Sequence, residues 1–375
     1  MIYREFGKTG IKVSTLGFGA MRLPMVEMDG KKNIDEDKAI PVIHRALELG
    51  VNYVDTAPYY CDGLSEITVG KALKGCRDKV YLSTKNPIED ASGEHFLERL
   101  EKSLKKLDTD YIDFYHMWGI SLKTYEEKIN MPDGPLQAAL KAKEQGLIKH
   151  LSFSFHDKPE NMIKIIDTGY FETVLCQYNL LDRANEKAIE YAHEKGLGTA
   201  IMGPVGGGRL GAPSAVIQEM LKGKTKSTAE MALRFVLANQ NVSLALSGMS
   251  TIEMVEENAA VASIPGVLTL EELKKVEEML EENKRLSELY CTGCNYCMPC
   301  PQGLNIPHIF KLMNYNRVYG LKDYAKEEYS KLKIQGNKTG NPADACVECG
   351  ACEAKCPQHL KIINQLKETS AALDC

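Results

Sequence analysis

A regular alternation of short apolar runs with longer amphipathic stretches over residues 1–265 restricts the fold more than any other pattern in the chain. Eight of the apolar runs have the length of strands, and a helical pattern follows each of them. The expected strands are Thr15–Ala20, Asn52–Asp55, Val80–Lys85, Ile112–Met117, His150–Ser154, Thr173–Gln177, Gly198–Met202 and Val242–Ser247. Eight strand–helix units in about 250 residues predict an α/β fold, namely a closed (β/α)8 TIM barrel.

An open, doubly wound sheet is the alternative for the same alternation. Its dinucleotide fingerprint, G-x-G-x-x-G directly after the first strand, is missing, because Gly17-Phe18-Gly19 supplies only the first part of that motif. Before the first barrel strand, Tyr3–Phe6 and Ile11–Val13 flank a glycine-containing turn and predict a β-hairpin. We expect this hairpin to plug the floor of the barrel.

The alternation of apolar runs and amphipathic stretches does not continue into the C-terminal part of the chain. Leu270–Leu289 is highly charged, with apolar residues at helical spacing, and predicts a long amphipathic helix that leads out of the barrel. The region that follows is rich in loops, with helical patterns at Ile306–Asn314 and Tyr324–Leu332 between two clusters of cysteines. We therefore expect a barrel domain over residues 1–285 and a small, mainly α-helical ferredoxin-like domain over residues 286–375.

Composition narrows the class of protein. The 375 residues are 44% hydrophobic and 26% charged, which allows a large core and excludes disorder as the main state. Lys and Arg number 46 against 51 Asp and Glu, so the net charge is −5, which disfavours nucleic acid as a partner. No apolar run approaches the about 20 residues of a membrane span, and the N-terminal residues lack an apolar signal core. We expect a cytoplasmic protein with no membrane or nucleic-acid partner.

Eight of the 12 cysteines lie in two short clusters near the C-terminus. The first cluster consists of Cys291, Cys294, Cys297 and Cys300. The second consists of Cys346, Cys349, Cys352 and Cys356, and both clusters end in Cys-Pro. Closely spaced thiolates followed by Cys-Pro are the ligand pattern of 4Fe–4S clusters, in which the fourth cysteine ligates the other cluster.

The spacing assigns the cysteines to two 4Fe–4S clusters. One is expected on Cys291, Cys294, Cys297 and Cys356, and the other on Cys346, Cys349, Cys352 and Cys300. The first run departs from the bacterial ferredoxin pattern, because two residues rather than three precede its Cys-Pro. Zinc ribbons would need pairs of cysteines set further apart, and disulfides are disfavoured in a reducing cytoplasm. Residues 288–370 resemble the α-helical ferredoxin domain of respiratory iron–sulfur subunits.

Polar side chains end several of the expected barrel strands. Asp55, Lys85 and His116 end successive strands, and barrel enzymes place their active sites at this edge. A strand-end Asp can instead cap a helix, and a single His is often a core residue. Lys85 has no such ordinary explanation, because a lysine that ends a buried strand needs a partner. The three residues together predict an active site.

The residues around these positions resemble the signature of the aldo/keto reductase family. The matching stretches are Val54–Tyr60, Ser65–Glu66, Gly70–Leu73, Ser83–Lys85, Asp113–His116, Ser152–Ser154, Gln177–Asn179 and Glu257–Asn258. The whole chain resembles the branch of that family that carries a C-terminal ferredoxin-type domain. The resemblance implies hydride transfer between a nicotinamide nucleotide and a small carbonyl or alcohol substrate.

The resemblance also implies a role for each of four catalytic residues. Tyr60 is the expected general acid, and Lys85 is the cation that lowers the tyrosine pKa from its ordinary value of about 10. Asp55 holds Lys85 in place, and His116 binds and orients the carbonyl group. Tyr59 is the alternative acid, but the family's spacing of five residues after the Asp selects Tyr60.

Some nucleotide contacts follow from the same resemblance. Ser154 and Gln177 match positions that bind the nicotinamide, Met202 matches the position of a stacking aromatic residue, and Glu257 and Asn258 match adenine contacts. Other contacts are expected from the local sequence alone. The glycine-rich loop that begins at Gly203 either approaches the pyrophosphate closely or is a flexible turn, and Ser250 and Thr251 lie at an expected helix N-terminus, which attracts phosphate. Three positions depart from the family pattern. Phe155 replaces the usual Asn, Met202 replaces an aromatic residue, and Met254 replaces the arginine that pairs with the 2′-phosphate of NADP. The cofactor is therefore expected to be NADP or NAD.

The combination of the two domains leaves three functional hypotheses. The first is an oxidoreductase whose clusters pass electrons to or from a redox partner protein, with a flavin as a further candidate cofactor. A flavin is included because hydride transfer moves two electrons, whereas an iron–sulfur cluster moves one. The second is a plain NAD(P)H-dependent carbonyl reductase with structural clusters. The third is a non-catalytic electron-transfer or redox-sensing subunit, which the intact set of catalytic residues disfavours.

Three long loops are expected to determine substrate specificity, and two further residues lie beside the expected catalytic ones. The loops are Met21–Ile34, Gly119–Met131 and Gly203–Lys226. Trp118, near His116, either lines the pocket or packs in the core, and Cys61 directly follows Tyr60.

Overall fold

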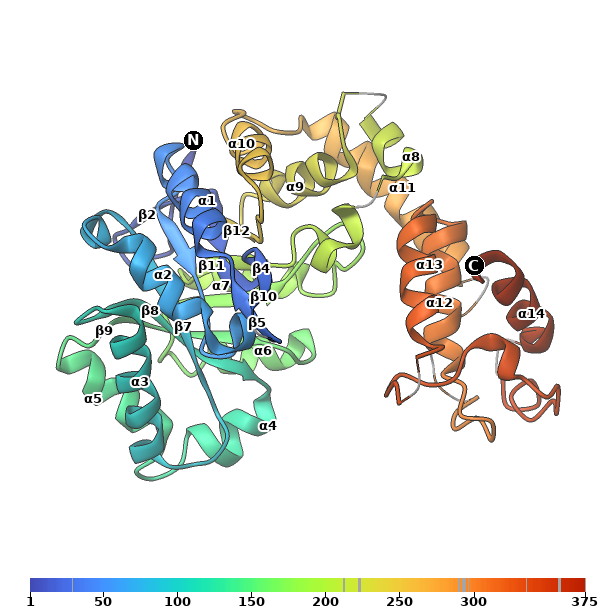
Figure 1. Ribbon diagram of the computed structural model, residues 1–375, viewed down its shortest axis with the longest axis horizontal. Helices are drawn as coiled ribbons and strands as arrows, with labels where there is room; N and C mark the ends of the chain where they lie inside the picture. The colour runs from blue at the N-terminus through green and yellow to red at the C-terminus, as the bar shows by residue number, and fades with distance from the viewer. Residues whose placement is uncertain are drawn as a thin grey trace. The chain divides into compact units, whose positions relative to one another are not determined.

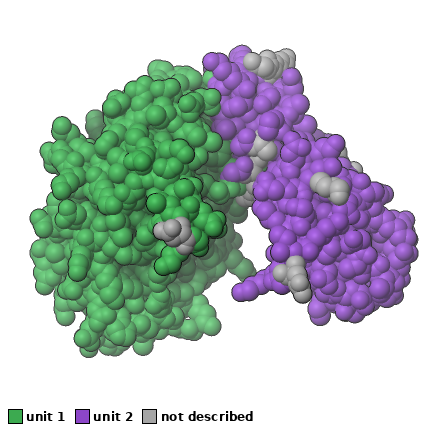
Figure 2. All heavy atoms as spheres, in the orientation of Figure 1, with its two compact units in different colours: residues 1–207, 232–268 green, residues 208–231, 269–375 purple. Residues whose placement is uncertain are grey.

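The computed structural model describes residues 1–28, 30–211, 213–221, 224–288, 291, 295, 297–334, 336–356 and 359–374 (Figure 1). At residues 209 and 284–288 it describes the backbone alone. The chain forms two compact units (Figure 2). The barrel unit comprises residues 1–207 and 232–268, and the C-terminal unit comprises residues 208–231 and 269–375.

The barrel unit is built around eight parallel strands that close in the order β10-β11-β12-β3-β6-β7-β8-β9. The strands are β3 (Leu16–Gly19), β6 (Tyr53–Asp55), β7 (Tyr81–Pro87), β8 (Ile112–Ile120), β9 (Ile148–Phe155), β10 (Thr173–Gln177), β11 (Gly198–Met202) and β12 (Leu244–Ser247). Each overlaps one of the eight predicted strands. The prediction of a closed (β/α)8 barrel is therefore confirmed.

Amphipathic helices follow the barrel strands, as the alternation predicted. They are α1 (Glu36–Glu48), α2 (Ser65–Leu73), α3 (Gly93–Leu107), α5 (Pro135–Glu144), α6 (Pro159–Ile166), α7 (Glu186–Lys195), α9 (Thr228–Ala238) and α10 (Ile252–Val261). Local sequence sets their ends. The Ser92 hydroxyl accepts a hydrogen bond from the His95 amide at the start of α3, and Gly196 ends α7 in the left-handed conformation with φ +86°.

The N-terminal hairpin closes the floor of the barrel, as expected. Its strands are β1 (Tyr3–Glu5) and β2 (Lys12–Ser14), which pair antiparallel. Phe6 follows β1 and is fully buried, with ring centroids 5.6 Å from Tyr53 and 4.9 Å from Phe114. These three rings fill the lower layer of the barrel interior.

The region predicted as the long loop Met21–Ile34 contains regular structure. It folds into a second antiparallel hairpin, β4 (Met25–Met28) with β5 (Lys31–Ile34). Gly30 supplies the turn, because its φ of +70° suits glycine better than other residues. The sequence did not reveal these strands because their side chains are mostly exposed and give no apolar alternation. The loop after β8 also contains regular structure, α4 (Leu122–Thr124) and a π-helical turn at Tyr125–Ile129.

The C-terminal unit is mainly helical. Its helices are α8 (Ala215–Gln218), α11 (Leu270–Glu288), α12 (Ile306–Arg317), α13 (Lys322–Lys331) and α14 (Ile362–Leu373). The Asn305 side chain caps α12 by accepting from the His308 amide, and the Tyr329 hydroxyl accepts from the Ala343 amide at 2.9 Å. Within the described residues, no helix is both long enough and apolar enough to cross a membrane.

Candidate functional site

Parallel strands bring the predicted acid and base of the barrel into direct contact. Lys85 Nζ lies 2.6 Å from Asp55 Oδ2 and donates a second hydrogen bond to the Thr56 carbonyl at 2.7 Å. The Ser83 hydroxyl donates to the other Asp55 oxygen at 2.8 Å. Lys85 is 2% exposed and Asp55 3% exposed. This is a buried, hydrogen-bonded ion pair at the C-terminal edge of the barrel.

Lys85 also faces Tyr60. Its Nζ lies 4.7 Å from the centroid of the Tyr60 ring. Burial acts to lower the pKa of Lys85, but Asp55 and Tyr60 outweigh burial, so the net change is upward and the ammonium keeps its charge at neutral pH. Burial also raises the pKa of Tyr60, and the opposing effect of Lys85 only reduces that rise. The phenol is therefore protonated at neutral pH and able to donate.

The structure separates the two adjacent tyrosines. Tyr59 is exposed, and its hydroxyl donates a 2.5 Å hydrogen bond to the carboxylate of Glu89. Trp118 contacts both rings, with centroids 5.4 Å from Tyr59 and 5.8 Å from Tyr60. Of the two phenols, that of Tyr60 is the one beside the ion pair, which places Tyr59 on the rim.

His116 lies on β8 directly opposite Lys85 in the register of β7 and β8. Its ring is fully buried, and within the described residues neither ring nitrogen has a hydrogen-bond partner of normal geometry. Burial and the charge of Lys85 lower the pKa of His116 to about 3, which outweighs the opposing effect of the Phe153 backbone. A buried neutral imidazole with unused nitrogens is suited to hydrogen-bond an incoming polar group.

Four of the predicted nucleotide contacts lie around the ends of β9, β10 and β11. Gln177 pairs with Met202 in the β10–β11 register, and Gly203 follows with φ +63°. A Cβ at Gly203 would lie 2.8 Å from the Gln177 amide, so the backbone can approach that side chain only because residue 203 is glycine. The Ser154 hydroxyl accepts from the Gly119 amide at 2.7 Å. Phe155, which replaces the family's Asn, is buried.

The other four predicted contacts lie at or near the start of α10. Thr251 caps this helix by accepting from the Met254 amide, and the Ser250 hydroxyl donates to the Met254 sulfur. Asn258 donates from Nδ2 to the Ser247 hydroxyl at 3.1 Å, which ties the helix to the end of β12. Glu257 is exposed. Only Asn258 is joined by a side-chain hydrogen bond to a barrel strand among these four in the described structure.

Sequence reasoning missed Arg22, which lies just beyond β3. Its guanidinium donates to the Gly207 carbonyl at 2.7 Å, and its side-chain carbons lie against Gly248, where a Cβ would be 3.2 Å away. Arg22 therefore connects the loops that follow β11 and β12. The sequence feature that could have revealed it is a basic residue three positions after Gly19, the last residue of the first barrel strand, β3.

Cys61 follows Tyr60 in a left-handed turn. Cys61 and Asp62 have φ of +52° and +55°, which is uncommon for residues other than glycine. The Cys61 thiol lies 3.5 Å from the Met21 carbonyl, and burial raises the pKa of this thiol. The thiol therefore stays protonated at neutral pH, which favours a structural role over a nucleophilic one.

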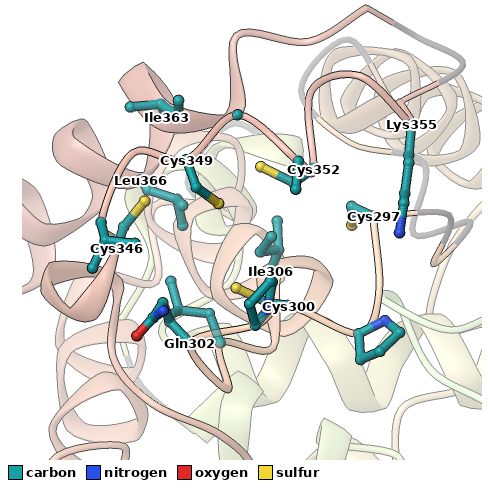
Figure 3. A pocket seen from close by; sticks show the side chains of 16 residues that line it. Cys297, Cys300, Gln302, Ile306, Cys346, Cys349, Cys352, Lys355, Ile363 and Leu366 are labelled. Carbon is teal, nitrogen blue, oxygen red and sulfur yellow. The ribbon is translucent and has the colours of Figure 1, made fainter.

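In the C-terminal unit, five of the clustered cysteines line one pocket. They are Cys297, Cys300, Cys346, Cys349 and Cys352. Figure 3 shows the sulfurs of Cys300, Cys346, Cys349 and Cys352 turned toward a common centre. Most of the other lining side chains are apolar, namely Leu304, Ile306, Ile363 and Leu366 together with Val347 and two prolines, while Gln302 and Lys355 are polar.

The other predicted set, Cys291, Cys294, Cys297 and Cys356, is grouped less clearly than the first. Cys297 also lines the pocket but lies apart from these four sulfurs (Figure 3). Cys291 is partly buried and Cys356 is buried. Cys294 lies outside the described residues. The structure therefore groups the set Cys300, Cys346, Cys349 and Cys352 more clearly than the other set.

This arrangement suits a cluster better than a single metal ion. A zinc ion would need its thiolates within about 2.3 Å of one point, and among the described residues no three metal-ligating side chains come close enough to share an ion. A 4Fe–4S cluster holds its four thiolates much further apart, around the corners of a cube. The apolar lining fits such a group, because it limits the access of water.

Comparisons with known proteins agree with both parts of the site. Residues 15–281 match the model of the aldo/keto reductase family, and residues 290–361 match a 4Fe–4S dicluster domain. L-galactose dehydrogenase of Arabidopsis thaliana is 30% identical over 312 residues, which cover 76% of this chain and 96% of that protein. Methylglyoxal reductase YeaE of Escherichia coli is 28% identical and covers 60% of this chain and 79% of its own length.

Solved structures show the same barrel. The holo form of an aldo-keto reductase from Bacillus halodurans superposes with a TM-score of 0.63 at 30% identity, covering 74% of this chain and 96% of its own. An aldo/keto reductase from Klebsiella pneumoniae in complex with NADP and acetate gives a TM-score of 0.61 at 25% identity, covering 73% and 94%. The fold, the matched residues and these relatives together show that the chain belongs to the aldo/keto reductase family and that a 4Fe–4S dicluster domain follows its barrel.

Proposed function

We propose that the barrel transfers a hydride between a nicotinamide nucleotide, NADP or NAD, and a small carbonyl or alcohol compound. The observation that carries this proposal is the grouping of Asp55, Lys85 and Tyr60 beside the imidazole of His116, whose nitrogens have no partner of normal hydrogen-bond geometry among the described residues. The Klebsiella relative with bound NADP supports NADP as the first nucleotide to test. When bound, the nicotinamide supplies or accepts the hydride.

In the direction of reduction, Tyr60 donates its proton to the carbonyl oxygen as negative charge develops there. Lys85 stabilises the phenolate that Tyr60 becomes, because its charge lies 4.7 Å from the ring and is held in place by Asp55. His116 donates a hydrogen bond to the same oxygen from its neutral imidazole and so orients the carbonyl group. In the direction of oxidation, the same phenolate accepts the proton of the alcohol.

Ser154 and Gln177 are proposed to hold the nicotinamide, and Gly203 lets the backbone approach it. Ser250, Thr251, Glu257 and Asn258 are proposed to hold the other half of the nucleotide, since the start of a helix attracts phosphate. Met202 forms the wall of this site in place of the family's aromatic residue. These assignments rest on the family pattern and on the proximity of Gln177, Met202 and Gly203.

For the C-terminal unit we propose two 4Fe–4S clusters that exchange electrons with a redox partner protein. Cys300, Cys346, Cys349 and Cys352 would hold one cluster, and Cys291, Cys294, Cys297 and Cys356 the other. Such clusters supply one-electron transfer when bound. The convergence of four sulfurs in one apolar pocket supports the first assignment.

Anaerobic titration of the reconstituted protein with NADPH, and separately with NADH, tests the link between the two units. We expect the broad visible absorption of the clusters to bleach in proportion to the nucleotide added. The flavin content of the same sample is measured by its absorption and fluorescence after denaturation. Binding of both nucleotides without bleaching would instead support a carbonyl reductase with structural clusters, and absence of binding would refute the nicotinamide assignment.

The carbonyl chemistry is tested by assaying NADPH-dependent reduction of small aldehydes and ketones, with methylglyoxal among the first. Tyr60→Phe removes the proposed proton donor, and Tyr59→Phe is the matched control because it removes only the hydroxyl bound to Glu89. Equal activity of the two variants would refute the assignment of Tyr60 as the proton donor, and absence of carbonyl reduction by the wild type would favour a non-catalytic barrel.

A further inference from the structure

One segment between two barrel strands belongs to the C-terminal unit. β11 ends at Met202 and β12 begins at Leu244, so everything between them would ordinarily be part of the barrel. Residues 203–207 are indeed in the barrel unit, but residues 208–231 are in the C-terminal unit. We call residues 208–231 the inserted segment. The chain therefore crosses between the units immediately before it and immediately after it.

Ser214 fixes the inserted segment to the rest of the C-terminal unit. Its hydroxyl donates to the Tyr319 carbonyl at 2.6 Å and accepts from the Ile217 amide at the start of α8. Its own amide donates to the Thr228 hydroxyl at 2.8 Å. Ser214 is only 1% exposed, so these hydrogen bonds are protected from water.

The backbone next to Tyr319 is shaped to receive the inserted segment. Gly320 has φ +63°, and a Cβ there would lie 3.3 Å from Val216 Cγ2 and 3.5 Å from Ser214 Oγ. Met220, in the inserted segment, is fully buried. The contact between the inserted segment and the turn that joins α12 to α13 is therefore close-packed, not a loose surface contact.

The residues that lead into the inserted segment come directly from the proposed nicotinamide site. Gly203, Gly206 and Gly207 have φ of +63°, +59° and +67°. Glycine residues can adopt many backbone conformations, so fixing this run in a single conformation costs conformational entropy. Gly203 lies against the Gln177 amide, and Gly207 accepts from Arg22. The inserted segment begins directly after this run.

We propose that Ser214 is a positioning residue for nucleotide binding. By attaching the inserted segment to Tyr319, it restricts residues 203–207 to the conformations that admit the nucleotide, so that less entropy is lost on binding. The effect is reciprocal: nucleotide bound at the barrel stabilises the packing of the inserted segment in the C-terminal unit. The inference rests on the proposed binding of a nicotinamide nucleotide and adds to it a coupling between the two units.

The test compares Ser214→Ala with Ser214→Thr in the full-length protein with its clusters. Alanine removes the hydrogen bond to Tyr319, whereas threonine keeps the hydroxyl. We expect Ser214→Ala to raise the Kd for NADPH, measured by calorimetry, about fivefold, equivalent to about 1 kcal/mol for one buried hydrogen bond. Ser214→Thr should restore the wild-type Kd. Ser92→Ala is the matched control, since it removes a helix cap on the barrel without touching the inserted segment.

Hydrogen exchange provides the readout that a purely structural role would not change. In the wild type, NADPH is expected to slow amide exchange at residues 319–325 of the C-terminal unit, and in Ser214→Ala this slowing should disappear. An unchanged Kd in folded Ser214→Ala, or no slowing in the wild type, would overturn the inference even if NADPH binds. The wild-type measurement decides the matter if the alanine variant does not fold. Failure of both NADPH and NADH to bind would overturn the proposed function as well.

Discussion

Breaking the Lys85–Asp55 pair should reveal how the barrel tolerates a buried charge. Lys85→Met removes the ammonium and leaves the Asp55 carboxylate, which is 3% exposed, with the Ser83 hydroxyl as a remaining side-chain partner. Removing one partner of a buried pair typically costs about 3–5 kcal/mol, because the other charge is left uncompensated. The Thr56 carbonyl also loses the hydrogen bond that it accepts from Lys85. We therefore expect the barrel of Lys85→Met to be less stable by about 4 kcal/mol.

The double variant Lys85→Met/Asp55→Asn separates the charge from the packing. The side-chain amide that replaces the carboxylate is neutral and still able to accept from Ser83, so the unpaired charge is gone. We expect this variant to recover at least about half of the lost stability, since neutral replacement of a buried pair is often tolerated. Trp118, the only tryptophan, lies on β8 and makes urea unfolding of the barrel visible by fluorescence. A double variant as unstable as Lys85→Met would refute the reasoning.

The catalytic tyrosine, the buried histidine and the cysteine pocket each give a further prediction. Tyr60→Phe should lower kcat for carbonyl reduction by about 10²- to 10⁴-fold, as expected for a lost general acid, whereas Tyr59→Phe should retain wild-type kcat. Because the pKa of His116 in the folded protein is about 3 and its ordinary value is 6.5, the unfolded chain takes up the proton first. His116 therefore contributes stability above pH 6.5 that is lost as the pH falls toward 3, and urea unfolding of His116→Gln should lack this part of the acid dependence. Cys349→Ala should lower the iron content and visible absorption of the reconstituted protein, while Cys76→Ala, a change in the barrel unit, should leave both unchanged; equal losses would contradict the cluster assignment.

The barrel could be predicted from the sequence because its strands and helices alternate in a regular pattern. Each strand is a short apolar run followed by an amphipathic helix, and tertiary contacts did not need to be known to see this pattern. The hairpin of β4 and β5 carries no such signal, since most of its side chains are exposed. It was therefore expected only as a loop.

The site was predictable to the extent that it depends on strand ends. Asp55, Lys85 and His116 lie on neighbouring strands, so closure of the barrel brings them together. Arg22 was not predictable in this way, because its contact with Gly207 joins two loops that are distant in the sequence. The direction in which the pKa of Tyr60 changes could not be predicted from the sequence either, because it depends on how strongly burial opposes the effect of Lys85.

The inserted segment shows a limit of reading domains along the chain. Residues 208–231 lie between two barrel strands, and their sequence gives no sign that they belong elsewhere. Their placement depends on Ser214 and Gly320 meeting across more than a hundred residues of chain. Such a contact leaves no local periodicity from which it could be inferred.

The closed floor of the barrel determines from which side protons and ligands can reach the proposed site. Phe6, Tyr53 and Phe114 fill the interior at the closed end of the barrel, away from the strand ends that carry Lys85, and so block a route through the floor. On the proposed function, a proton donated by Tyr60 is then replaced from the side of the strand ends and not through the floor. Nucleotide and substrate would then also enter from the side of the strand ends, and whichever of them binds deeper would enter first and leave last. The order of events in a turnover would then be set by three aromatic rings that touch none of the reactants.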